Sequence, residues 1–417
     1  MTQATKTGMT MHQFFATQPV FNRRQRVWGH ELIYRGQDLT RFADVSDDHF
    51  FALERSANAY ATNLRGKVGG NKMMRNFTER SIMKKAPSAL DPKGSIVEVS
   101  EASAITPEFI ASLDQLKKNG YRIAVDDFEG LPGSEPLLER ADLLKIDILE
   151  KRPQDILKLC NMAGDPSPVL VAKNVDYIEL FNLAKAMGFS LFQGTFFKKA
   201  EILEDRKLTS SELTRMELFK IIETGEPDFK ALSAAISKDA SISYRLLVFL
   251  NSAAFSFPTE ITSIDHAVVL LGWQQIKTWL RIAILNDLSP SPTKAELIRL
   301  ASQRSSFFKL AAQRSGYKAH DPDKLFLLGL FSLLEPIMDM FMEELVESLP
   351  VDDEIKAGLC REKNVYSLWI EMASRMEAGH WSFLDRIVAY LKLDPHAVAK
   401  SYYDAHVLTN SFYDSGA

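Results

Sequence analysis

The sequence has little of what disulfide stabilisation or membrane insertion would require. Only two cysteines occur in 417 residues, Cys160 and Cys360, and neither lies in a CxxC or CxxH spacing. This excludes a disulfide framework and a zinc–thiolate site. The longest apolar stretch begins at Leu325 and is broken by Glu335 and Pro336, well short of the roughly 20 apolar residues that a membrane-spanning helix needs. We therefore expect no membrane span.

Positive charge is scarce in the second half of the chain. Residues 201–417 contain 23 Lys and Arg against 30 Asp and Glu, whereas residues 1–200 contain 27 against 24. Phosphate backbones are bound by clustered basic side chains, so we expect no nucleic-acid partner. Residues 1–12 lack the apolar core of a secretory signal and are interpreted as a disordered lead-in, which favours a cytoplasmic location.

Length and composition favour a globular protein of two domains. In the first 200 residues, short β-like runs alternate with helical runs, and several of the β-like runs are continuously apolar, as in a buried parallel sheet. The predicted strands are Phe15–Phe21, Val27–Tyr34, Met73–Phe77, Ser95–Val99, Arg122–Phe128, Leu143–Ile148, Val169–Ala172 and Ser190–Gln193. Eight strands with intervening helices favour an α/β barrel, with a doubly wound sheet as the alternative.

The helical runs between these strands carry end signals. They are Asp48–Leu64, Thr106–Asn119, Asp155–Met162 and Tyr177–Met187. The second opens with Thr106 followed by a proline, a typical N-cap and first position, and Gly120 and Gly188 stand where helix C-caps belong. After about residue 200 the β pattern fades, and from Phe229 nearly everything is amphipathic helix, which predicts an all-helical second domain.

Acidic residues recur at the ends of the predicted strands. Glu31, Glu98, Asp126, Asp127 and Asp147 all stand there. In an α/β barrel the carboxyl ends of the strands meet at one mouth, where the catalytic groups lie. Converging carboxylates could bind a pair of Mg²⁺ or Mn²⁺ ions that hold phosphate and activate water. Any single acid of this kind is more often a helix cap or a surface ion pair, so only the set indicates a site.

Eight motifs in the first half, taken in order, resemble the EAL domain, the family of cyclic di-GMP phosphodiesterases. They are Gln18-Pro19-Val20, Glu31-Leu32-Ile33-Tyr34-Arg35, Asn76-Phe77-Thr78, Glu98-Val99-Ser100-Glu101, Val125-Asp126-Asp127-Phe128, Leu144-Lys145-Ile146-Asp147, Val171-Ala172-Lys173-Asn174-Val175-Asp176 and Phe192-Gln193-Gly194-Thr195-Phe196-Phe197. The resemblance implies a TIM-like (β/α) barrel over residues 13–205.

The second half resembles the HDOD domain, an all-helical signalling module related to HD phosphohydrolases. The matching segments are Phe229–Leu232, Ile236–Asp239, Leu246–Phe255 and Thr262–Trp273. The resemblance implies an all-helical domain over residues 206–417, and the whole chain is similar to a bacterial EAL–HDOD signalling protein.

The EAL resemblance assigns roles residue by residue. The positions that hold metal ions are matched by Glu31, Asn76, Glu98, Asp126 and Asp127. Lys145 matches the lysine that positions the attacking water, and Gln193 matches a late strand-end glutamine of the site. Arg35 matches an arginine that contacts a ligand phosphate, and Gln18 lies in a motif that lines the pocket.

Lys173 departs from this pattern, because it stands where the family has an essential glutamate. An ammonium replaces a carboxylate inside the cluster. At an effective dielectric constant near 20, two unit charges about 4 Å apart interact by about 4 kcal/mol, enough to remove most of the affinity for a divalent ion. We expect Lys173 to pair instead with Glu98, Asp126 or Asp127, leaving the metal positions vestigial and without metal.

The segment that follows the paired aspartates departs as well. It contains Pro132 and Pro136, which stiffen a loop that the family keeps adaptable. By resemblance, Glu101 supports this loop and Asp176 replaces its second glutamate partner. Two independent departures argue against retained phosphodiesterase activity.

The helical half lacks hydrolase chemistry too. Where HD hydrolases have their His-Asp pair, this chain has Ser332 and Leu333, and its histidines show no metal-ligand spacing. The numerous aromatic residues, among them Trp273 and Trp279, are mostly expected in the core, but a helical domain without chemistry commonly presents a groove or a face to a protein partner.

Three functions stay open. The first is a non-enzymatic signalling protein, in or near cyclic di-GMP pathways of motility or biofilm formation, that acts through protein contacts of the HDOD domain. The second is a receptor that binds cyclic di-GMP without cleaving it, through Gln18, Glu31, Arg35, Asn76, Lys145, Lys173 and Gln193. The third is a residual phosphodiesterase, in which Lys145 would act and Mg²⁺ or Mn²⁺ would be required. The first two need no cofactor, and a homodimer is compatible with all three.

Overall fold

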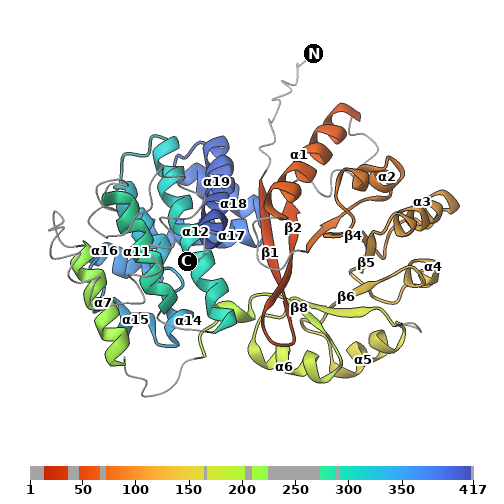
Figure 1. Ribbon diagram of the computed structural model, residues 1–417, viewed down its shortest axis with the longest axis horizontal. Helices are drawn as coiled ribbons and strands as arrows, with labels where there is room; N and C mark the ends of the chain where they lie inside the picture. The colour runs from red at the N-terminus through yellow and green to blue at the C-terminus, as the bar shows by residue number, and fades with distance from the viewer. Residues whose placement is uncertain are drawn as a thin grey trace, which may run out of the picture.

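The computed structural model describes residues 14–35, 47–65, 72–163, 167–201, 209–223, 273–287 and 291–414. They form two lobes side by side, which we call the barrel (residues 14–201) and the helical lobe (residues 209–414) (Figure 1). The predicted lead-in over residues 1–12 lies outside the described residues. In the described ranges, no helix combines the length and the apolar character needed to cross a bilayer.

Eight strands close the barrel, as the sequence predicts. They are β1 (Phe15–Asn22), β2 (Val27–Tyr34), β3 (Met73–Asn76), β4 (Ser95–Ser100), β5 (Arg122–Asp126), β6 (Leu143–Asp147), β7 (Val169–Lys173) and β8 (Leu191–Gln193). Each lies within two residues of its predicted bounds. The closed barrel excludes the doubly wound alternative.

The first strand runs against its neighbours. β1 pairs antiparallel with both β2 and β8, whereas β2 to β8 are parallel to one another. The link from β1 to β2 contains only four residues, of which Gln25 adopts a left-handed backbone with φ 55°. Such a short link closes a hairpin and cannot form the crossover that a parallel pair requires.

Helices cover the outside of the barrel. They are α1 (Asp47–Arg65), α2 (Glu79–Met83), α3 (Pro107–Lys118), α4 (Glu135–Leu138), α5 (Pro153–Asn161) and α6 (Ile178–Ala186), with short 3₁₀ turns η2 (Ala86–Ala89) and η3 (Phe196–Lys198). Thr106 caps α3 as predicted, because its hydroxyl accepts from the backbone N–H of Phe109. Gly120 and Gly188 follow their helices at φ 89° and 102°, a conformation that favours glycine.

The floor of the barrel is an apolar layer to which seven of the eight strands contribute one side chain each. Its buried members are Val20, Met74, Ile96, Ala124, Leu143, Val171 and Leu191. Inward-facing side chains at this level fill the barrel as a packed core. The polar residues at the carboxyl ends of the strands therefore lie above a dry floor.

The helical lobe contains the described helices α7 (Ser210–Glu223), α11 (Trp273–Asp287), α12 (Pro292–Arg314), α13 (Pro322–Phe331), α14 (Leu334–Met338), α15 (Met342–Val346), α16 (Asp353–Leu359), α17 (Val365–Glu377), α18 (Trp381–Tyr390) and α19 (Pro395–Asp414). For the described residues of this half, the all-helical prediction is confirmed. The predicted division between residues 205 and 206 falls between the end of η3 and the start of α7, in a segment outside the described residues, and stays a prediction.

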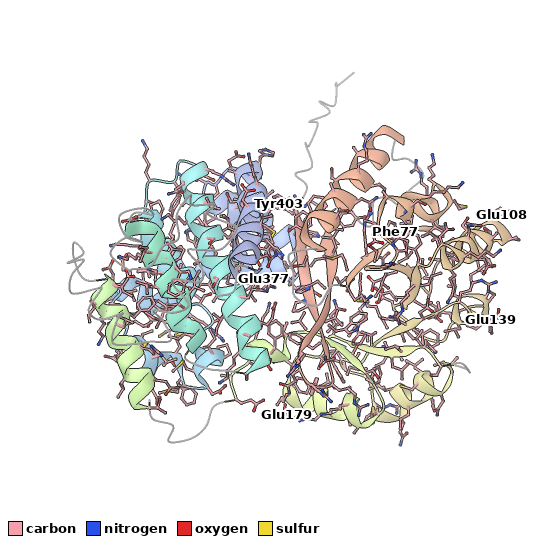
Figure 2. The ribbon with its side chains drawn as sticks, in the orientation of Figure 1. Phe77, Glu108, Glu139, Glu179, Glu377 and Tyr403 are labelled. Atoms are coloured by element: carbon pink, nitrogen blue, oxygen red, sulfur yellow. The ribbon has the colours of Figure 1, made fainter. Side chains whose placement is uncertain are left out.

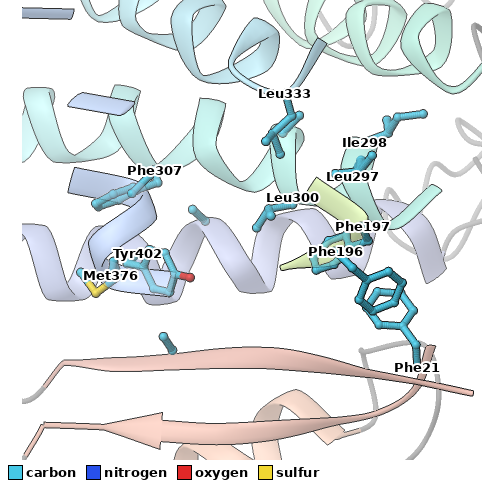
Figure 3. Close-up of a cluster of buried hydrophobic side chains, with 14 of the residues drawn as sticks. Phe21, Phe196, Phe197, Leu297, Ile298, Leu300, Phe307, Leu333, Met376 and Tyr402 are labelled. Carbon is cyan, nitrogen blue, oxygen red and sulfur yellow. The ribbon is translucent and has the colours of Figure 1, made fainter. Parts of the chain in front are cut away.

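A shared apolar core joins the two lobes. Helix α12 contacts both η3 and β2, and α17 contacts β1. Figure 3 shows Phe21, Phe196 and Phe197 of the barrel beside Leu297 and Leu300 of α12. All five side chains are buried. The junction is therefore packed like a protein interior and positions the helical lobe against the barrel.

Candidate functional site

A buried lysine organises the polar centre of the barrel. Lys145, on β6, has no exposed surface, and its Nζ lies 2.8 Å from Glu31, 2.6 Å from Glu98 and 3.6 Å from Asp126. Burial alone would lower the pKa of this amine, but the carboxylates of Asp126, Glu31 and Glu98 raise it well above its usual range. Lys145 is therefore an ammonium that neutralises the strand-end acids from below.

Glu98 is the most deeply buried of the strand-end acids at this mouth. It has no exposed surface, and one of its carboxylate oxygens has no hydrogen-bond partner in the described structure. Burial, reinforced by the nearby charge of Glu31, raises the pKa of Glu98 well above its usual range.

A second lysine pairs with the two aspartates. Lys173 ends β7, and its Nζ lies 2.7 Å from Oδ1 of Asp126 and 2.6 Å from Oδ1 of Asp127. Although burial opposes it, the charge of Asp126 raises the pKa of Lys173. The pKa of Asp126 is lowered despite its burial, because Lys145 and Lys173 both favour the ionised form. Asp127 adopts a left-handed backbone with φ 53°, which aspartate tolerates better than most residues.

The remaining predicted residues of the centre lie beside these groups. Gln193, at the end of β8, donates from Nε2 to Glu31 at 2.6 Å and to Gln18 at 3.0 Å. Asn76 is buried at the end of β3, directly beside Glu98 in the strand register. The fold thus brings together, around one mouth, the residues that the resemblance assigns to metal and ligand, with the exception of Arg35.

The donor set at this mouth does not fit a divalent ion. Two ammonium groups bond to Glu31, Glu98, Asp126 and Asp127, the acids that would have to supply metal ligands. In the described part of the chain, no cluster of three or more His, Cys, Asp or Glu has an arrangement that could hold a metal ion. Lys173 places a positive charge directly beside Asp126 and Asp127.

Glu101 holds the loop that follows β5. Its two carboxylate oxygens accept from the backbone N–H groups of Glu129 at 2.6 Å and Leu131 at 2.7 Å. Asp176 lies elsewhere, where it accepts from the hydroxyl of Thr195 at 2.8 Å. Glu101 is therefore placed to support this loop, whereas Asp176 braces the segment after β8.

Two predicted ligand residues contact the helical lobe. Gln18 donates from Nε2 to the backbone carbonyl of Glu377 at 3.2 Å. The guanidinium of Arg35 donates to the carbonyl of Trp381 at 3.1 Å and pairs with Asp385 at 2.5 Å. Arg35 does not line the cleft described below, so its contact with a ligand phosphate stays a prediction that would require release of this pair.

Sequence reasoning missed an ion cluster that joins the lobes. Glu377, at the end of α17, is buried and accepts from Arg304 through both oxygens, at 2.7 and 2.8 Å, and from Lys198 of the barrel at 2.9 Å. Figure 2 shows Glu377 in the region between the two lobes. Although burial opposes it, the charge of Arg304, with that of Lys198, lowers the pKa of Glu377 to about 2. The available signal was its helical spacing, since Glu377 continues the buried row of Trp369 and Ala373 on α17.

A cleft of about 900 Å³ opens between the lobes at the barrel mouth. The barrel contributes Gln18, Glu31, Lys173, Gln193 and Lys198 to its walls, and the helical lobe contributes Arg299, Arg304, Arg375, Glu377 and Trp381, among others. The five lysine and arginine side chains of these walls are each within ion-pair distance of a carboxylate. As it stands, the cleft offers an anion no unpaired lysine or arginine among its described walls.

The helical lobe has no hydrolase pair at the expected position. Ser332 accepts from Arg304 at 3.1 Å and donates to a backbone carbonyl, and Leu333 is buried. Trp279 is buried, as predicted for a core residue. The side chain of Trp273 lies outside the described residues.

The protein thus combines a barrel whose strand-end acids pair with two lysines and a lobe whose described elements are helices. The model of the HDOD domain matches residues 208–392. The uncharacterised protein YuxH of Bacillus subtilis is 31% identical over 379 residues, which cover 89% of this chain and 92% of YuxH. Cyclic di-GMP phosphodiesterase CdgJ of Vibrio cholerae is 27% identical over 398 residues, 94% of this chain and 91% of CdgJ.

Two solved structures that hold cyclic di-GMP and calcium are similar to about half of this chain. BlrP1 of Klebsiella pneumoniae, in complex with calcium and cyclic di-GMP, matches at 24% identity and a TM-score of 0.38, over 45% of this chain and 55% of BlrP1. YkuI of Bacillus subtilis, in complex with cyclic di-GMP and calcium, matches at 14% identity and a TM-score of 0.39, over 55% of this chain and 72% of YkuI. The protein belongs to the family that it shares with YuxH, and it combines a closed eight-stranded barrel with a region, residues 208–392, that matches the HDOD domain.

Proposed function

We propose that the protein is a non-enzymatic regulator in or near cyclic di-GMP pathways, and that its barrel has lost phosphodiesterase activity. The observation that carries this proposal is the pairing of Lys173 with Asp126 and Asp127. A metal-dependent hydrolysis needs those oxygens for a cation that binds phosphate and activates water. The link to cyclic di-GMP is supported by the relationship to CdgJ, which is described as a phosphodiesterase of that dinucleotide.

A turnover assay tests the loss of activity. We expect the unmodified protein, supplied with Mg²⁺ or Mn²⁺, to leave cyclic di-GMP intact, and we expect Lys173→Glu to gain metal binding and some hydrolysis. Lys151→Glu is the matched control, because Lys151 also pairs with a carboxylate of the barrel, that of Glu129 at 2.8 Å. Hydrolysis by the unmodified protein at a rate that Lys173→Glu does not improve would overturn the proposal in favour of a residual phosphodiesterase.

Regulation through protein contacts is the second part of the proposal. Phe383 and Tyr390, on α18, are 49% and 71% exposed and lie two helical turns apart on one side of the helix. Arg386 lies over the ring of Phe383 at 4.2 Å. Exposed aromatic and arginine side chains are typical of protein interfaces. A partner recovered from the native host that binds Phe383→Asp and Tyr390→Asp as well as the unmodified protein would exclude this face.

A receptor that binds cyclic di-GMP without cleavage is the second candidate function. The cleft of about 900 Å³ favours it, because Gln18, Glu31, Lys173 and Gln193 of the predicted ligand set lie in its walls. Calorimetric titration with cyclic di-GMP in EDTA and in Ca²⁺ separates the candidates. Saturable binding in EDTA supports a metal-independent receptor, whereas no heat in either buffer supports a scaffold. The cytoplasmic location and the homodimer stay predictions.

A further inference from the structure

The turn between α17 and α18 sits at the barrel mouth. Gln18 bonds to the carbonyl of Glu377 at its beginning, and Arg35 bonds to the carbonyl of Trp381 at its end. The indole of Trp381 also stacks on Phe14, with ring centroids 6.1 Å apart and planes within 9°. One short segment of the helical lobe therefore binds the barrel through hydrogen bonds and aromatic stacking.

Two barrel cations at this contact are neutralised by carboxylates of the other lobe. Arg35 pairs with Asp385 at 2.5 Å, and Lys198 pairs with Glu377 at 2.9 Å. The other cations of the cleft walls are paired within their own lobe: Lys173 with barrel aspartates, Arg299 with Glu296, Arg304 with Glu377 and Arg375 with Glu371. Separation of the lobes would therefore release Arg35 and Lys198 and leave those other pairs intact.

Phosphate-bearing ligands are recognised by the same cations that carboxylates engage, since both anions accept charge-assisted hydrogen bonds from Arg and Lys. A phosphodiester that enters the closed mouth meets cations that are already paired. We propose that Asp385 and Glu377 act as a built-in competitor for phosphodiester ligands, so that the closed arrangement of the lobes and a bound ligand exclude one another. This inference rests on the receptor function proposed above.

Gln18 would couple the presence of a ligand in the mouth to the closed arrangement of the lobes. Its side-chain oxygen accepts from Gln193, which also bonds to Glu31, while its amide nitrogen donates to the helical lobe. An occupant of the mouth that takes the amide of Gln18 therefore removes a bond to the turn between α17 and α18. Opening would expose the face of the helical lobe that the barrel now covers, which is how occupancy could be relayed to a partner.

The test compares Asp385→Asn with a matched pair inside the barrel. Arg140 and Asp114 form a similar pair at 2.7 Å, with side chains 19% and 44% exposed, against 13% and 50% for Arg35 and Asp385. We expect Asp385→Asn to bind cyclic di-GMP in EDTA roughly two- to fivefold more tightly than the unmodified protein, the factor that one partly exposed ion pair supplies. Asp114→Asn should bind like the unmodified protein. Circular dichroism checks that each variant is folded.

A second measurement reports on the lobes themselves. Cys160 lies in the barrel and Cys360 in the helical lobe, and they are the only cysteines of the chain, so spin labels on both give an interlobe distance. We expect this distance to lengthen when cyclic di-GMP is added, in the unmodified protein and in Asp385→Asn.

If Asp385→Asn and Asp114→Asn both bind cyclic di-GMP with the same affinity, the proposed competition is wrong. The proposed receptor function would still hold. An interlobe distance unchanged by bound ligand would overturn the competition in the same way. Absence of binding by every variant would overturn both, because a released Arg35 would then attract no phosphodiester. Hydrolysis of the ligand is measured separately and bears only on the loss of phosphodiesterase activity.

Discussion

The ammonium of Lys173 lies 2.7 Å from Oδ1 of Asp126, at the point of the barrel where the family resemblance implies a metal ion. The ammonium is covalently part of the chain, so it neutralises the acids at all times and cannot be exchanged or chelated. This one pairing separates the electrostatics of this mouth from those of a metal-dependent site.

Removal of the Lys173 ammonium should destabilise the barrel. In Lys173→Met, Asp126 and Asp127 lose a charged partner, and Asp126 is buried, so we expect the free energy of unfolding at pH 7 to fall by about 1–3 kcal/mol. Urea denaturation measures the change. Lys151→Met is the control, because its pair with Glu129 is more exposed and should contribute less than about 1 kcal/mol. Equal losses in both variants would contradict a structural role for Lys173.

Lys145 should be more costly to remove than Lys173. It has no exposed surface, and Lys145→Met would leave Glu31 and Glu98 buried without a cation, with an expected loss of about 3–5 kcal/mol. Adding Glu98→Gln to this variant should restore part of the stability, since it removes one unpaired acid. A double-mutant cycle measured by thermal unfolding should show strong coupling, and additive effects would disprove the pairing.

The ion cluster at Glu377 predicts a dependence of stability on acid pH. The folded-state pKa is about 2, below the usual 4.5, so the unfolded chain takes up the proton first as the pH falls. The contribution to stability is complete above about pH 4.5 and is lost as the pH falls towards 2; its full size is about 3 kcal/mol. The difference in unfolding free energy between the unmodified protein and Glu377→Gln should shrink over this range, and a constant difference would contradict the assignment.

The burial of His406 predicts a second dependence of stability on pH, at a pH nearer to 7. This side chain has no exposed surface, neither ring nitrogen has a hydrogen-bond partner in the described structure, and burial, with the charge of Arg299, lowers its pKa well below 6.5. Above pH 6.5 both the folded and the unfolded states are neutral; below it the unfolded chain gains a proton that the folded state resists, so stability falls. His406→Leu should reduce this loss between pH 6.5 and 5. His396→Leu, at an exposed histidine, serves as the control for the replacement of a histidine by leucine.

The barrel could be predicted closely because its strands carry their own signal. Several are short apolar runs between helical segments, and a run such as Leu143–Asp147 can be buried on both faces only in a sheet covered by helices. The antiparallel pairing of β1 was not part of the prediction, although the four-residue link after Asn22 contains the signal for a hairpin.

The polar centre was predictable as a group, since the carboxyl ends of parallel strands meet at one mouth whatever the details. The partner of each charged side chain could not be predicted from the sequence. Lys173 could have paired with Glu98, but Lys145 lies closer to that acid from β6, and Lys173 reaches Asp126 and Asp127 instead. Pairing depends on distances of a few ångströms that strand order alone does not supply.

The sequence by itself determined the charges at the mouth. A lysine stands among the strand-end acids, and a protonated lysine has no lone pair with which to bind a metal ion. Tertiary structure alone decided what that mouth faces. Gln18 and Arg35 meet Glu377 and Asp385 across about 350 residues of sequence. Contacts between lobes arise from the fit of two whole surfaces, and no local spacing in the sequence encodes them.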